Sequence, residues 1–187
     1  FPIITDNELL TLVQKQTFKY FWDFGHPVSG LARERNTSEN IVTTGGSGFG
    51  IMSIIVGINR NFISKADGLA RLQKIVAFLK TADTFHGAFP HWLNGNTGKV
   101  QPFSAKDNGA DLVETSFIAQ GLICVKQYFK NGNQQEKELS ASHAYVQIFE
   151  NKGAMMGCSS NGARNRAQAI RVRLSSTGVK DDTAKRP

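Results

Sequence analysis

Apolar residues recur every three or four positions through the first 138 residues, and this spacing predicts helices rather than strands. The first helix is expected to begin at Thr5, because Thr5 and Glu8 have the spacing of a capping box. The segment from Gly48 to Asn59 is apolar on nearly every side, which predicts a helix buried all round. The five expected helices cover about 5–24, 48–59, a stretch opening at 64, 109–129 and a last piece from about 134.

The connections between these helices alternate between short and long. About five residues join the second helix to the third, whereas about two dozen residues precede the second helix and again the fourth. Loops of that length are usually functional. Alternate connections of an up-and-down helical array emerge at the same end, so we expect both long loops on one face. The pattern predicts half of a toroid of helical hairpins, with the second and fourth helices inside.

The composition changes near Glu138 and divides the chain in two. Of the 18 aromatic residues, 16 lie before that point. The first 138 residues hold 14 Lys and Arg against 12 Asp and Glu, and residues 139–187 hold 8 against 3, so the net charge of +7 belongs mostly to the second part. We expect an ordered domain over 1–138 and a basic, disordered tail over 139–187. Because the basic residues of the tail are scattered and no aromatic residues lie among them, a nucleic-acid-binding arm is disfavoured.

The first long loop carries Arg33 and Arg35, followed by a glycine run that ends at Phe49. A glycine run of this kind can cradle a phosphate at the start of a helix. No strand is expected before it and no Lys-Ser or Lys-Thr pair follows it, so neither nucleotide-binding pattern is met. A tight turn that lets a ligand approach the backbone is the better interpretation.

The second long loop is rich in aromatic and imidazole side chains, from Phe85 through His86 and His91 to Trp92. Two histidines five positions apart do not have the spacing of metal ligands on a helix, and no further Cys or His lies near them. We expect neither a metal ion nor a cofactor. A platform that stacks against a sugar ring fits these residue types better.

Three carboxylates surround the start of the fourth expected helix, at Asp107, Asp111 and Glu114. Offsets of four and seven place them along one narrow stripe of a helix. One interpretation is capping, with Asp107 as the cap and the other two near the positive helix end. The other is catalysis, because closely spaced carboxylates in a poorly solvated site raise at least one pKa and can supply the acid and base of glycoside hydrolysis. Spacing alone does not decide between the two.

Five stretches of the sequence are similar to the glucoamylase-like proteins of Bacteroidetes, which include glycoside hydrolase family 144, the endo-β-1,2-glucanases. They are 13–22, 26–35, 42–52, 85–92 and 106–117. The resemblance implies an (α/α)6 barrel in an exported protein that cleaves β-1,2-linked glucan by an inverting route. It also implies important acidic residues at Asp107, Asp111 and Glu114. The residues expected to bind the sugar are Arg33, Arg35, Phe49, His86, His91 and Trp92.

Members of that family are several hundred residues long and continue beyond the position of Phe129 into a Trp-rich segment and further helices. We therefore expect an incomplete (α/α)6 barrel, the N-terminal portion of such an enzyme, which lacks part of the active site and is inactive. A slip of the reading frame or a mispredicted gene end would explain the divergent tail. The absent initiator Met fits a mature periplasmic or secreted protein, no apolar stretch is long enough to span a membrane, and we expect a monomer.

Two other functions remain open at this stage. The first is a carbohydrate-binding fragment that keeps the aromatic and acidic face without catalysis, which parallel hydrolysis and oligosaccharide-binding assays would reveal. The second is a small helical interaction protein whose basic tail binds an acidic partner. Salt-dependent binding of DNA or acidic lipid, lost on deletion of residues 139–187, would favour it.

The tail gives a direct test of the division at Glu138. From about Asn151 onward we expect no persistent helix or strand, because aromatic residues and hydrophobic periodicity end together there. Amide hydrogen exchange measured by mass spectrometry should show little protection across Ser159–Val179. Strong protection of that segment, comparable to the helices before Glu138, would contradict the division.

Overall fold

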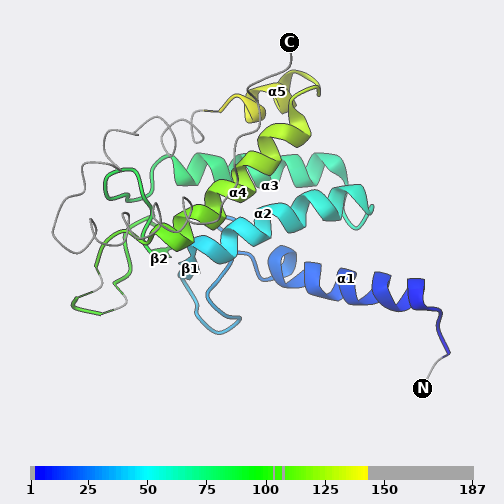
Figure 1. Cartoon of the computed structure of the whole chain (residues 1–187), viewed down its shortest axis with the longest axis horizontal. Coiled ribbons are helices and arrows are strands. Elements are labelled where there is room, and N and C mark those ends of the chain that lie inside the picture. The colour runs from blue at the N-terminus through cyan, green and yellow to red at the C-terminus, as the bar shows by residue number, and fades with distance from the viewer. Residues whose placement is uncertain (1–2, 103, 107, 143–187) are drawn as a thin grey trace, which may run out of the picture. The chain divides into compact units, whose positions relative to one another are not determined.

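The computed structural model describes residues 3–102, 104–106 and 108–142, and these form five helices and one small antiparallel sheet (Figure 1). Helix α1, Asp6–Asp23, begins as predicted with a capping box. The Thr5 side chain accepts from the Glu8 amide at 3.3 Å, and the Glu8 carboxylate accepts from the Thr5 amide at 2.8 Å. The tail predicted to be disordered from about Asn151 lies outside the described residues.

Helix α2, Thr44–Asn59, begins four residues earlier than the sequence predicts, so the glycine run is helical and the tight-turn interpretation is wrong. The glycines serve the crossing of α2 over α4, Leu112–Phe129. A β-carbon at Gly48 would overlap the carbonyl group of Phe117, and one at Gly121 would lie 2.6 Å from the carbonyl oxygen of Gly48. Backbone therefore meets backbone where the two helices cross (Figure 1).

Helix α3, Lys65–Leu79, and helix α5, Gln134–Ser140, complete the helical array. Ser64, where the third helix was expected to open, caps α3 by accepting from the Asp67 amide. The largely buried Glu136 carboxylate of α5 pairs with Lys65 of α3 at 2.8 Å. Leu139 lies in the common core, so the helical unit extends past the predicted boundary at Glu138. The disorder predicted for most of 139–187 stays a prediction.

Burial separates the helices less sharply than the sequence predicts. Helix α2 buries nine of its sixteen residues, as expected for an inner helix. Helix α4 buries seven of eighteen residues and α3 six of fifteen, which are nearly equal fractions, so burial does not set α4 apart from α3 as the sequence predicts. Helix α1 contributes Phe18 alone to the buried set. No helix in the described part of the chain has both the length and the apolar character needed to cross a membrane.

Two short strands lie within the long loops, and one of them directly precedes the glycine run, where the expectation of no strand is wrong. Strand β1, Ile41–Thr43, pairs antiparallel with strand β2, Trp92–Asn94. Isolated bridges extend the pair on both sides, from Arg33 to Val42 and from Leu93 to Val100. The described residues are thus mainly helical, in agreement with the predicted class, with a small ribbon added. Closure into an (α/α)6 barrel stays a proposal.

Because glycines lie where α2 and α4 cross, a glycine-to-alanine change there should lower the free energy of unfolding instead of raising it. Alanine within a helix normally stabilises by about 1 kcal/mol, yet Gly48→Ala should lower the free energy of unfolding by about 1–3 kcal/mol because its methyl group overpacks the α2–α4 contact. Urea unfolding measures both effects. The matched control is Gly109→Ala, since a β-carbon there has no neighbour within 4 Å. Equal stability of the two variants would contradict the backbone-to-backbone crossing.

Candidate functional site

The β1–β2 pair fastens the two long loops together at the N-terminal ends of α2 and α4 (Figure 1). Its register sets Thr43 opposite Trp92 and Ile41 opposite Asn94. Thr43 is also the N-cap residue of α2, so the ribbon leads directly into that helix. The prediction that both long loops lie at one end of the helical array is therefore confirmed.

The segment Phe89–His91, which we call the linking segment, hydrogen-bonds to the start of both inner helices. On the α2 side, the Thr44 amide donates to the His91 carbonyl at 3.1 Å and the Thr44 hydroxyl donates to the Pro90 carbonyl at 2.7 Å. On the α4 side, the Asp111 amide donates to the Phe89 carbonyl at 2.8 Å. The linking segment thereby fixes where the first turn of α4 lies relative to the first turn of α2.

Asp111 is the N-cap residue of α4, and its backbone is extended rather than helical. One oxygen, Oδ1, accepts from the amides of Val113 and Glu114 at 2.9 and 3.1 Å. The other, Oδ2, lies 2.9 Å from Nδ1 of His91. Partial burial pulls the pKa of the Asp111 carboxyl upward, but the Glu114 amide, the His91 ring and the Val113 amide together hold it below its usual value. Asp111 is therefore an anion at neutral pH.

Glu114 lies in the first turn of α4 and reaches across to the first turn of α2. Its Oε2 accepts from the Gly45 amide at 2.7 Å and from the Thr43 hydroxyl at 3.1 Å. A β-carbon at Gly45 would collide with this carboxylate, so glycine is required for the contact. Both bonds use one oxygen, and among the described residues Oε1 accepts no hydrogen bond. Glu114 thus joins the inner helices and keeps one oxygen available.

Asp111 and Glu114 do not lie on one stripe of a helix. Because α4 begins at Leu112, Asp111 precedes the helix and the argument from helical offsets is wrong for it. Asp107 lies outside the described residues. The capping interpretation named Asp107 as the cap, whereas the structure gives that role to Asp111. Asp111 and Glu114 nevertheless lie at the same end of α4, because Asp111 caps the helix and Glu114 is in its first turn.

Two of the predicted sugar-binding residues, Arg33 and Trp92, belong to the ribbon region. Partners in an antiparallel pair project to the same face of a sheet, so Arg33 shares a face with Val42, and Trp92, one position from Leu93, projects to the other. The buried Nε of Arg33 has no hydrogen-bond partner among the described residues. Arg33 and Trp92 therefore start from opposite faces of the ribbon, and the common cleft expected for them stays a prediction.

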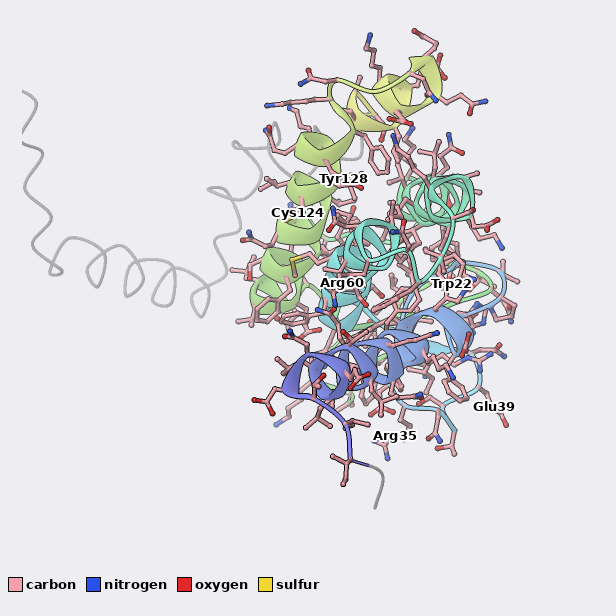
Figure 2. All side chains as sticks on the ribbon, turned by 90° about the vertical axis from the view of Figure 1, so that its right-hand side faces the viewer. Trp22, Arg35, Glu39, Arg60, Cys124 and Tyr128 are labelled. Carbon is pink, nitrogen blue, oxygen red and sulfur yellow. The ribbon has the colours of Figure 1, made fainter. Side chains whose placement is uncertain are left out.

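Arg35, His86 and Phe49 are all exposed. Arg35 pairs with Glu34 at 2.6 Å, and Figure 2 shows it at the outer edge of the helical unit, away from Cys124 on α4. His86 has a positive φ of 54° at the turn that precedes Gly87. Phe49 packs against Phe117 of α4 with a ring-centroid distance of 5.0 Å. Their roles as sugar ligands stay predictions.

Sequence reasoning missed a buried histidine that secures the first loop. His26 is 1% exposed; its Nε2 lies 3.1 Å from Oδ1 of Asn40, and its Nδ1 accepts from the amides of Val28 and Ser29. Burial lowers the pKa of its imidazole, so the ring is neutral. The ring packs on Gly95 of the second loop, where a β-carbon would lie 2.7 Å from it. The glycine at position 95, which permits this close approach, was the available signal in the sequence.

The site therefore offers two carboxylates with different surroundings beside an imidazole and an indole. The His91 and Trp92 rings meet edge to face, 5.5 Å apart. Within the described ranges, no three His, Cys, Asp or Glu side chains are grouped so that they could hold a metal ion. An anionic carboxylate beside aromatic rings suits the recognition of hydroxyl groups and of a sugar face.

Comparison with known proteins gives a consistent set of relatives. Residues 13–177 match the family described as "Protein of unknown function (DUF3131)". The match continues well past Glu138. The sequence is 50% identical over 141 residues to an exo β-1,2-glucooligosaccharide sophorohydrolase (non-reducing end) of Parabacteroides distasonis, which covers 74% of this chain and 20% of that protein.

Solved structures agree with this result. An endo-β-1,2-glucanase from Chitinophaga pinensis, in complex with sophorotriose and glucose, is 53% identical with a TM-score of 0.72. It matches 81% of this chain and 37% of its own length. A β-1,2-glucanase from Parabacteroides distasonis is 46% identical with a TM-score of 0.75, over 80% of this chain and 21% of its own. The chain thus spans between about a fifth and two fifths of these relatives.

The cap made by Asp111 predicts a pH-dependent loss of stability. Asp111→Ala should lower the free energy of unfolding by about 1 kcal/mol at neutral pH. Because the pKa of Asp111 is lower folded than unfolded, its contribution is present above the unfolded pKa, near 3.8, and is lost as the pH falls through the folded value. Urea unfolding of Asp111→Ala and of the unmodified chain, from pH 7 down to the lowest pH at which both fold, measures how their free energies of unfolding converge.

Asp6→Ala is the matched control for the Asp111 variant. Asp6 lies in the first turn of α1, where Thr5 provides the cap, so its loss should cost less. A stability difference between Asp111→Ala and the unmodified chain that is constant over the whole pH range would contradict the capping role of the ionised carboxylate.

Proposed function

We propose that this chain forms one wall of a glycoside hydrolase site for β-1,2-linked glucan. The premise is that the chain belongs to the DUF3131 family and is a relative of the glycoside hydrolase family 144 proteins of Bacteroidetes. The relatives named above act on β-1,2-glucan or its oligosaccharides, and they match across most of the described residues. We therefore propose both the substrate class and the residues of this chain that contact the substrate.

The observation that carries the proposal is the meeting of the long loops with two carboxylates. Pairing of β1 with β2 brings the loops to the same end of the helices at which Asp111 and Glu114 lie. A site for an extended glucan needs carboxylates and aromatic rings on a common surface, and this end supplies both. Trp92 and Phe49 are the aromatic side chains that we propose for sugar contact.

We assign the acidic residues according to their contacts. Inverting hydrolysis needs a protonated acid at the leaving oxygen and a carboxylate that activates water on the opposite side. The lowered pKa of Asp111 suits an ionised role, as a base or as an acceptor for sugar hydroxyls, and not the role of proton donor. Glu114 offers Oε1 to the substrate while Oε2 holds α2. Asp107 remains a third candidate by resemblance.

The share of each relative that this chain matches bears on whether its residues suffice for hydrolysis. The chain covers 37% of the Chitinophaga pinensis enzyme and 20% of the curated hydrolase. The described carboxylates lie on one helix start, whereas the reaction needs groups on opposite sides of the scissile bond. We propose that the remaining groups and the closing helices of an (α/α)6 barrel belong to the portion of the relatives that these 187 residues do not match.

Location and assembly follow the same reasoning. A polymeric glucan is met outside the cytoplasm, so we propose a periplasmic or secreted protein. We also propose that it acts as a monomer on an oligosaccharide or glucan substrate, without a nucleic-acid partner.

The activity of the 187-residue chain is the first test. We expect no measurable release of sophorooligosaccharides from β-1,2-glucan, whereas a full-length relative hydrolyses it under the same conditions. Replacing the residues of that relative that match Asp111 by Asn or Glu114 by Gln should lower its rate by about two orders of magnitude. Chromatography of the products measures both. Hydrolysis by the short chain, together with full activity of the substituted relative, would contradict the proposal.

A binding measurement separates the proposal from its nearest alternative. If the 187-residue chain binds sophorooligosaccharides in calorimetry without cleaving them, and the substituted relative keeps its rate, the face is a carbohydrate-binding surface without a catalytic role. Loss of binding on replacing Trp92 by Ala would then locate the sugar on the loop end.

A further inference from the structure

The two oxygens of the Asp111 carboxylate are held by different parts of the chain. Oδ1 belongs to the helix, because it accepts both amides of the first turn of α4. Oδ2 lies 2.9 Å from Nδ1 of His91 in the linking segment. The helix cap therefore fixes one oxygen, while the direction of the second depends on a residue twenty positions earlier.

His91 is itself fixed by its backbone on both sides. Its carbonyl accepts the first amide of α2, from Thr44. The residue before it, Pro90, accepts the Thr44 hydroxyl, and the residue after it, Trp92, pairs with Thr43 in the ribbon. The imidazole thus extends from a backbone that three separate contacts hold against α2. A side chain on such a backbone transmits the position of α2 to the carboxylate on α4.

We propose that His91 is a positioning residue, whose Nδ1–H holds Oδ2 of Asp111 in one orientation at the loop end. Because an ionised carboxylate only accepts hydrogen bonds, the ring nitrogen at 2.9 Å must carry the hydrogen. This assigns His91 a role different from the sugar contact predicted from the sequence. The inference rests on the proposed function in one respect, namely that the oriented carboxylate faces a glucan.

Partial exposure fits a carboxylate that serves a ligand as well as the fold. The side chain of Asp111 is 30% exposed and that of His91 is 34% exposed. An exposed pair of this kind contributes little to stability because water screens it. Its geometric effect does not depend on that energy, since a carboxylate displaced by about 1 Å at a reacting centre can cost about 100-fold in rate. His91 therefore acts on orientation more than on folding.

Two substitutions of His91 test the inference in the 187-residue chain. His91→Leu removes the donor, and His91→Asn places an amide N–H close to the position of Nδ1. The pKa of the Asp111 carboxyl, followed by carbon-13 NMR, should rise in His91→Leu, because a hydrogen bond to the charged form is lost. It should return toward the unmodified value in His91→Asn. Rescue by asparagine distinguishes the specific donor from a general effect of the ring.

The control variant is His86→Asn, on the same loop and exposed, which should leave the pKa of Asp111 unchanged. Thermal unfolding shows whether each variant is folded. If His91→Leu does not fold, the asparagine variant still decides the test, because a lowered pKa of Asp111 in His91→Asn supports the contact. An unchanged pKa of Asp111 in folded His91→Leu would overturn the inference, whatever reaction the protein takes part in.

The matching substitutions in a full-length relative connect the contact with the reaction. The leucine variant should lose up to about 100-fold in kcat with a smaller change in KM, and the asparagine variant should recover part of it. If the pKa of Asp111 shifts as expected but the kcat of the relative does not change, the hydrogen bond exists but does not position the carboxylate for the reaction, and the inference is overturned. The Asp111→Asn exchange in the relative tests the proposed function separately. The two failures are thereby distinguished.

Discussion

The close crossing of α2 and α4 is the constraint on which the rest of the site depends. Gly48 and Gly121 let the two backbones touch, where any β-carbon would force the helices apart. At that separation the side chain of Glu114 can reach the Gly45 amide directly, and Gly45 again has to be glycine to admit the carboxylate. A wider crossing would break this bond and would also displace the linking segment, which is hydrogen-bonded to both helix starts.

Local signals predicted the helix starts that are governed by local chemistry. Thr5 and Ser64 are caps whose side chains bond within three residues, and the sequence shows both. The start of α2 was missed because glycine has a low helix propensity, and the packing that favours it there involves a helix some seventy residues later. The three-residue strands were missed for the same reason, since their pairing partners lie about fifty residues apart.

The candidate site was predictable as a set of residues, but its geometry was not. Spacing drew attention to Asp111 and Glu114, although the assumed helical stripe is wrong because Asp111 precedes the helix. The glycine run that includes Gly45 was interpreted as a turn, and the contact of Thr43 and Gly45 with Glu114 was not predicted, because it depends on a carboxylate from another helix. The separation of Arg33 from Trp92 depends on strand register, which a one-residue shift would reverse.

Capping and catalysis were opposed as explanations of the acidic cluster, yet the structure makes them compatible at Asp111. The cap uses Oδ1 and leaves Oδ2 to be oriented by His91, so the helix start serves to hold the carboxylate ready before a ligand arrives. The same hydrogen bonds keep Asp111 ionised, and an ionised group cannot be the proton donor of an inverting pair. In the inverting hydrolysis that we propose, the acid is then another group, and the capped carboxylate takes the part that requires a negative charge.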